Sequence, residues 1–269
     1  MLYTLLILAL AAAAGGAVNS VAGGGTLLTF PTLAAALGGD DQALKMANIT
    51  STLALFPGSL AAVWGYRREL EGNGAWIKLL IGPSLIGGIV GSLLLVWLPD
   101  KVFGLLVPWL VLLAAVLFAM QPQIARWTGI GKEQAAPTRN MAVGVFVFQF
   151  LVAVYGGYFG AGIGILMLSS LAMMGLGDIH RMNALKTLLA SSINGTSVAI
   201  FLWIDLTADT ATEKVIHWPY AAVMIAASIA GGYGGARIAQ RMNKNLVRWI
   251  VVTIGFALAG YYFYSKFAK

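Results

Sequence analysis

Two very long stretches of this sequence contain no charged residue. The first charge along the chain is Asp40, and residues 141–176 also lack Asp, Glu, Lys and Arg. A continuous helix over residues 1–37 would be roughly 55 Å long at 1.5 Å per residue, whereas the hydrocarbon core of a bilayer is about 30 Å thick. Each stretch must therefore bend back on itself. Glycine runs mark the two bends, at 23–25 in the first stretch and at 156–164 in the second.

The composition of the chain indicates an integral membrane protein. Of its 269 residues, 59% are hydrophobic and only 10% are charged, against roughly 25% charged residues in soluble domains. The net charge of +7 comes from basic residues in short connections, at 67–68, 126–139 and 237–248. Such loops face the cytoplasm of a membrane protein, so we expect no nucleic-acid partner. The start of the chain lacks the basic region of a signal peptide, so we expect a retained first helix.

No metal or cofactor is expected. The sequence has no cysteine and only two histidines, His180 and His217. Thiolate metal sites and disulfides are therefore excluded. No serine, histidine and acid constellation or pair of carboxylates occurs in a span, which argues against an enzyme.

The apolar runs predict an all-α, polytopic membrane protein made of two repeats. Each repeat is a glycine-broken hairpin followed by three transmembrane helices. An odd number of crossings per repeat places the second copy upside down relative to the first. The expected first repeat is 1–120, with a hairpin at 1–38 and spans at 43–66, 76–98 and 102–120; a cytoplasmic linker follows at 121–139; the second repeat is 140–269, with a hairpin at 140–176 and spans at 180–204, 217–239 and 246–267.

Matching residues in the two halves support a duplication. Gly164 lies 139 residues after Gly25, and Trp203 lies 139 residues after Trp64. Glycines 87, 88 and 91 match 231, 232 and 235 at a separation of 144. We expect this second set to serve close helix packing of the GxxxG kind.

The glycine breaks are the first candidate binding elements. Glycine permits tight turns and exposes backbone N–H groups that bind anions at helix N-termini. In hydrocarbon such groups must line a cavity, although close packing of helices is the alternative explanation. The expected site residues in the breaks are Gly23, Gly24, Gly25, Thr26, Gly160, Gly162 and Gly164.

Polar residues on the helix after each hairpin are the second candidate set. Those of the second half share roughly one helical face, as expected for a stripe that contacts protein or water, although hydrogen bonds between packed helices would also explain them. Lys186 needs a partner in a span, which is either a bound anion or the cytoplasmic interface reached by snorkelling. Lys45 is expected to be an interfacial anchor. The expected site residues in this set are Asn48, Thr52, Asn183, Lys186, Thr187, Ser191 and Asn194.

These motifs resemble the TauE/SafE sulfite exporter family. The resemblance covers AGGGTLLTFPTL and ANITSTLALFPGSLAAVWGYRRE in the first half, and GGYFGAGIGILML and NALKTLLASSINGTSVAIF in the second. Asn48 matches the asparagine of the first-half signature, and Asn183, Lys186 and Asn194 match the second-half pattern. The chain departs from the family at Ile49, where members often have lysine, and at Asn19, where an acidic residue is common.

The resemblance implies a multi-pass transporter of small sulfur-containing anions such as sulfite or organosulfonates, acting as an exporter. From the residues we expect a secondary active transporter in a bacterial plasma membrane, with alternating access between two inverted halves. A passive anion channel and a non-transporting membrane scaffold are the alternatives. The sequence leaves open whether a proton or sodium ion is coupled to transport and whether the chain forms a homodimer.

Overall fold

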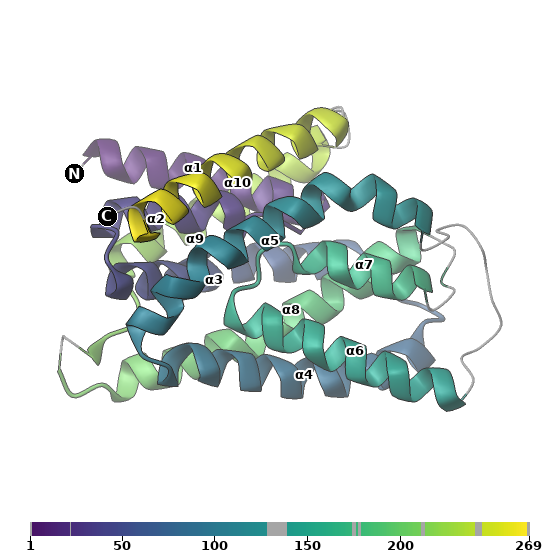
Figure 1. Ribbon diagram of the computed structural model, residues 1–269. Helices are drawn as coiled ribbons and strands as arrows, with labels where there is room; N and C mark the ends of the chain where they lie inside the picture. The colour runs from purple at the N-terminus through teal and green to yellow at the C-terminus, as the bar shows by residue number, and fades with distance from the viewer. Residues whose placement is uncertain are drawn as a thin grey trace.

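The computed structural model describes residues 2–21, 23–127, 139–173, 176, 179–210, 213–239 and 244–267. These residues form ten α-helices and contain no β-strand. The predicted all-α class is confirmed. The helices lie roughly along one direction and form a single bundle (Figure 1).

Five helices come from each half of the chain. Those of the first half are α1 (Leu2–Val21), α2 (Thr26–Leu37), α3 (Asp41–Gly65), α4 (Gly74–Trp97) and α5 (Asp100–Trp127). Those of the second half are α6 (Arg139–Tyr158), α7 (Ile163–Met173), α8 (Ile179–Thr207), α9 (Trp218–Ala239) and α10 (Lys244–Phe267).

Helix α5 is longer than the sequence predicted. Residues 121–127, expected in the linker, continue the helix, and Pro122 lies inside it. A proline in a membrane helix is tolerated because local adjustments and neighbouring groups satisfy the freed carbonyl. Proline was therefore a poor guide to the end of this span. The remainder of the expected linker, residues 128–138, lies outside the described residues.

Each glycine-broken stretch is a hairpin with one long and one short helix. Helices α1 and α6 have 20 residues each, whereas α2 has 12 and α7 has 11. At 1.5 Å per residue the two short helices measure only about 16–18 Å, which is less than the hydrocarbon core. The first hairpin begins and ends at the left end of the molecule in Figure 1, and the second at the right end. The two corners therefore enter the bundle from opposite ends.

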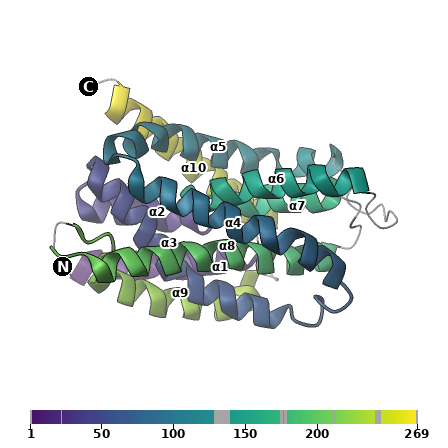
Figure 2. The same ribbon diagram turned by 90° about the horizontal axis from the view of Figure 1, so that it is seen from below.

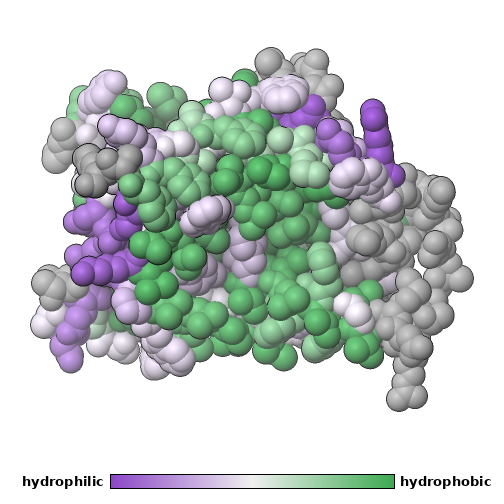
Figure 3. Space-filling model, in the orientation of Figure 1, coloured by the Kyte–Doolittle hydropathy of each residue, from purple (hydrophilic) through white to green (hydrophobic). Residues whose placement is uncertain are grey.

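The outer surface of the bundle suits a membrane. Among the described residues, six helices are long and apolar enough to cross one: α1, α3, α4, α5, α8 and α10. Hydrophobic side chains cover the middle of the face shown in Figure 3, and hydrophilic ones gather at its left end and upper right. Trp64 and Trp203, at opposite ends of the bundle, are exposed, as expected for aromatic side chains at the two interfaces.

The helices pack with an internal symmetry. Helix α1 packs on α9 and α4 packs on α6, and these are the two most extensive contacts (Figures 1 and 2). Each helix of the first half corresponds to the helix five places later, so that α1 corresponds to α6 and α5 to α10. When both helices of a packed pair are replaced by their counterparts, the result is nearly always another packed pair. The exception is α3–α5, whose counterpart α8–α10 is not among the more extensive contacts of the described residues. This regularity supports a duplication of five helices.

Glycines make the two largest contacts possible. A Cβ atom on Gly87 would lie 2.6 Å from the Cβ of Ala153 on α6, and one on Gly91 would overlap the carbonyl oxygen of Val154. On α9, a Cβ on Gly231 would overlap the carbonyl oxygen of Ala13 on α1. The expected packing role is confirmed for Gly87, Gly91 and Gly231, whereas the surroundings of Gly235 lie outside the described residues.

We expect Gly91→Ala to lower the thermal stability of the detergent-solubilised protein, because the added methyl group meets the backbone of α6. Overpacking of this kind costs about 1–3 kcal/mol. Gly82→Ala, on the same helix, is the matched control because a Cβ there has no neighbour within 4 Å. Equal melting temperatures for the two variants would contradict the packing role.

Candidate functional site

A small cavity lies where the two glycine corners meet. A Cβ atom on Gly23 would be only 3.0 Å from the Cα of Gly164, so the backbones of the two hairpins are in contact. The cavity beside this contact has a volume of about 30 Å³. Its walls come from both hairpins and from helices α3 and α8. The lining residues are Gly16, Asn19, Gly23, Thr26, Thr52, Leu55, Gly58, Ser59, Ala62, Gly160, Ile163, Gly164, Lys186, Thr187, Ala190, Ser191 and Asn194.

Left-handed glycines end the long helix of each hairpin. Gly23 has φ +74° and its N–H donates to the carbonyls of Val18 and Asn19. Gly160 has φ +77° and its N–H donates to the carbonyl of Tyr155. These bonds are C-caps, and they satisfy terminal carbonyls of α1 and α6. The caps let the chain reverse direction inside the bundle.

The short helices α2 and α7 begin at the cavity. First-turn N–H groups of a helix have no acceptor within that helix. Here several of them donate to carbonyls of the preceding turns: Leu27 and Leu28 to Gly24 and Gly25, and Ile163 and Ile165 to Gly160 and Gly162. The dipole of each helix adds a partial positive charge at its N-terminus. Two helix N-termini that approach from opposite ends therefore make the cavity attractive to an anion.

Lys186 supplies a full positive charge at the cavity wall. Its side chain is 2% exposed, and its Nζ has no hydrogen-bond partner among the described residues. The Oγ of Ser191, which is also buried at the wall, has none either. A cation inside a membrane span costs about 2.5–3.5 kcal/mol unless it is paired or solvated. The buried position of Nζ argues against snorkelling and leaves this ammonium group available to a ligand in the cavity.

Neutral polar groups complete the wall. Hydroxyls come from Thr26, Thr52, Ser59 and Thr187, and amides come from Asn19 and Asn194. The Asn19 amide donates to the Ser59 hydroxyl over 3.0 Å, which joins α1 to α3. No acidic or aromatic side chain occurs among the described residues that line the cavity. The wall is therefore rich in hydrogen-bond donors and carries a net positive charge.

Nine of the residues expected at the site line the cavity: Gly23, Thr26, Thr52, Gly160, Gly164, Lys186, Thr187, Ser191 and Asn194. Ser59 was not expected at the site. Its position could have been inferred, because Thr52, Leu55, Ser59 and Ala62 follow one another at helical spacing and so share one face of α3. Asn19 was noted only as a departure from the family pattern. The other missed residues have small or apolar side chains with no chemical signal: Gly16, Leu55, Gly58, Ala62, Ile163 and Ala190.

Three expected glycines do not line the cavity. Gly24 packs against the Phe118 ring, Gly25 packs against the backbone of Gly15, and Gly162 lies near Ala114 on α5. The corner of a hairpin has two sides, and these glycines lie on the side that packs against other helices. Their small size therefore permits helix contact.

Asn48 and Asn183 are also away from the cavity. The Asn48 amide is buried and donates to the Tyr158 carbonyl over 3.0 Å. Asn183 lies one turn before Lys186, and its carbonyl accepts from the Thr187 hydroxyl. Lys45, expected as an interfacial anchor, is 9% exposed and forms an ion pair with Asp100 instead.

Comparisons with known proteins agree with this architecture. Residues 7–262 match the family described as Sulfite exporter TauE/SafE. A "Probable membrane transporter protein" of Haemophilus influenzae is 26% identical over 250 residues, which cover 93% of this chain and 90% of the relative. The "Probable membrane transporter protein YfcA" of Escherichia coli K12 is 25% identical over 93% of this chain and 86% of its own length. A "Probable membrane transporter protein ORF9" of Sinorhizobium is 24% identical over 96% and 91%.

The relatives are matched over nearly their whole length, so the resemblance extends to the complete bundle and both glycine corners. A transporter role fits a multi-pass integral membrane protein with a polar cavity in its interior. The chain belongs to the TauE/SafE sulfite exporter family of membrane transporters.

Proposed function

We propose that this protein is a secondary active transporter of a small oxyanion, with sulfite as the leading candidate, in the plasma membrane of a bacterium. The single observation that carries the proposal is the buried Nζ of Lys186, which has no partner in the part of the chain that the structure describes, at a cavity where two helix N-termini meet. Oxyanions accept several charge-assisted hydrogen bonds, and these are the strongest that neutral and cationic donors make. The family description, which names sulfite export, supports the same substrate class.

The lining of the cavity favours an inorganic anion over a large organosulfonate, because an organic substituent would need a continuous apolar surface to contact. The few apolar side chains at the wall, Leu55, Ala62, Ile163 and Ala190, are dispersed over three helices. Substrates such as sulfite present oxygens on every side and match a wall of donors.

The contact between the two corners favours a carrier over an open channel. Gly23 and Gly164 touch inside the bundle, so the backbone itself interrupts a straight path between the two ends. A carrier exposes its site to one side at a time, by movement of inverted elements about a fixed site. An ion gradient or the anion's own gradient must supply the energy.

We expect sulfite to raise the melting temperature of the purified protein and to drive counter-exchange in proteoliposomes. A ligand at about 100 times its Kd stabilises the folded state by about 2.7 kcal/mol. Sulfate, thiosulfate, sulfoacetate and taurine form the comparison series, and imposed proton or sodium gradients identify the coupling ion. Stabilisation by cations or neutral solutes alone would contradict an anion site. Flux that never saturates and shows no exchange would indicate a channel.

A further inference from the structure

Eight of the ten described helices form two bodies that do not coincide with the two halves of the sequence, and the remaining two, α5 and α10, pack on each other. Helices α1, α2 and α3 contact one another, and α9 packs on both α1 and α3. We call these four helices the first body. Helices α6, α7 and α8 contact one another, and α4 packs on both α6 and α8; these four are the second body. Each body therefore contains one helix from the other half of the chain, α9 in the first body and α4 in the second.

The two bodies cross at α3 and α8. A Cβ on Gly195 would lie 3.3 Å from the ring of Phe56, and these residues are 139 apart, the separation that also relates the glycine corners. A pair of equivalent residues in contact marks the centre of the internal symmetry. On α8 every cavity residue precedes Gly195, from Lys186 to Asn194. On α3 the lining continues past the crossing to Ala62, toward the connection with Arg67 and Arg68.

The cavity thus extends from the centre toward the end that we assign to the cytoplasm. On the opposite side three side-chain contacts among the described residues join the two bodies. In one of them Nε1 of Trp218 on α9 donates to Oδ2 of Asp205 on α8 over 2.8 Å, and the other two involve Lys45 and Asn48 on α3. The Asn48 amide on α3 donates to the Tyr158 carbonyl at the end of α6.

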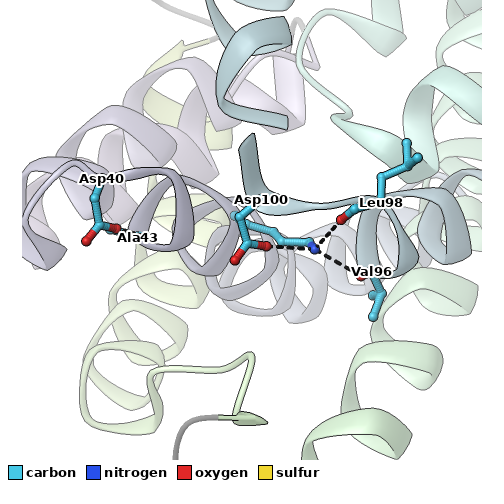
Figure 4. Close-up of polar contacts among 6 residues, drawn as sticks. Asp40, Ala43, Val96, Leu98 and Asp100 are labelled. Atoms are coloured by element: carbon cyan, nitrogen blue, oxygen red, sulfur yellow. Dashed lines mark hydrogen bonds and ion pairs between the residues drawn. The ribbon is translucent and has the colours of Figure 1, made fainter. Parts of the chain in front are cut away.

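Lys45 makes the third connection. Its Nζ donates to the carbonyls of Val96 and Leu98 at the end of α4, over 2.9 and 2.8 Å, and to Oδ1 of Asp100 over 2.9 Å (Figure 4). An ammonium group has three N–H donors, so all three are used. The contacts tie the start of α3 in the first body to the end of α4 in the second.

We propose that Lys45 and Asn48 form the outer gate of the transport pathway, holding the two bodies together on the outside while the cavity faces the cytoplasm. This inference rests on the proposed function. Transport then requires the bodies to rotate about the α3–α8 crossing, a rigid-body movement of the kind that many switching proteins use. The rotation breaks the bonds of Lys45 and Asn48 and opens the anion site to the outside.

The internal symmetry identifies what closes on the cytoplasmic side in that state. At a separation of 139, Asn48 is equivalent to Thr187, and Tyr158 is equivalent to Asn19. Thr187 and Asn19 are on opposite bodies and both line the cavity. They come together when Asn48 and Tyr158 separate, so they form the inner gate.

The absence of cysteine from the sequence makes a cross-linking test direct. The variant Asn19→Cys/Thr187→Cys is reconstituted with and without Lys45→Met, and disulfide formation is followed with a mild oxidant. We expect Lys45→Met to speed this cross-link several-fold, because the outer gate no longer holds the bodies. Lys45→Arg, which keeps donors to the same acceptors, should restore the slow rate.

Oxidation of the inner-gate pair should abolish the anion flux that the reduced double-cysteine variant retains. Ser92→Cys/Ser197→Cys is the matched control, since the two hydroxyls are 2.7 Å apart within the second body and their disulfide should leave flux intact. A cross-linking rate that is indifferent to Lys45→Met, or flux that persists through the oxidised 19–187 pair, would overturn the gate. The cross-linking rate is measured without substrate, so it tests the gate independently of the anion proposal. Absence of any anion flux in the parent protein would contradict only the proposed function.

Discussion

Replacement of Lys186 by methionine should remove sulfite binding and transport while leaving the protein folded. Methionine fills a similar volume without the charge. A hydrogen bond to a charged group contributes about 1.5–3 kcal/mol, which corresponds to roughly a 10- to 150-fold weaker Kd. The same change removes an unpartnered cation from a buried position. We therefore expect an unchanged or higher melting temperature without ligand, and a much smaller rise than in the parent protein when the same sulfite concentration is added.

Two controls separate a loss of binding from damage to α8. Ser192→Ala changes a neighbouring hydroxyl that bonds to the Leu188 carbonyl in its own helix and does not line the cavity. It should retain the sulfite response. Lys186→Arg keeps the charge and should retain part of the binding. A sulfite-induced stabilisation in Lys186→Met equal to that of the parent would remove this lysine from the anion site.

The architecture was largely predictable from the sequence because the bilayer imposes strong rules. An uncharged stretch too long for one crossing had to bend, and glycine was the residue able to form the bend. The structure has a hairpin at each of the two places, with Gly23 and Gly160 in the left-handed conformation. The predicted all-α class and the TauE/SafE family are confirmed.

The pairing of helices was not predictable in the same way. Helices α4 and α9 are apolar on most of their surface, so their sequences do not specify which neighbours they contact. Their glycines indicated close packing, but the choice of α6 by Gly91 and of α1 by Gly231 depends on the three-dimensional arrangement. The exchange of α4 and α9 between the bodies therefore appears only in the structure.

The candidate site was predictable where polar residues repeat along a helix. Lys186, Thr187, Ser191 and Asn194 share one face of α8, and that face lines the cavity. Asn48 belongs to a similar stripe on α3, yet it lies on the opposite side of the α3–α8 crossing. Helical spacing identifies a face and does not say which part of that face adjoins a cavity.

Gly23→Ala should reduce transport strongly, because Gly23 combines a left-handed backbone with contact between the two corners. Its φ is +74°, and an added Cβ would lie 3.0 Å from the Cα and 3.4 Å from the N of Gly164. The left-handed conformation costs a non-glycine residue about 1–3 kcal/mol. The backbone of the opposite hairpin has no flexible side chain that could move aside, so the corners must separate. Separation enlarges the cavity and misplaces the N-termini of α2 and α7.

Gly39→Ala isolates the effect of that contact. Gly39 has φ +76° and no atom within 4 Å of an added Cβ, so it incurs the same backbone strain with no corner to displace. Both variants should lose thermal stability to a similar extent, whereas only Gly23→Ala should lose sulfite exchange in proteoliposomes. Equal exchange rates in the two variants would show that the corners can separate without consequence. Transport would then depend on Lys186 and the α8 face, and the meeting of the two hairpins would be only a matter of packing.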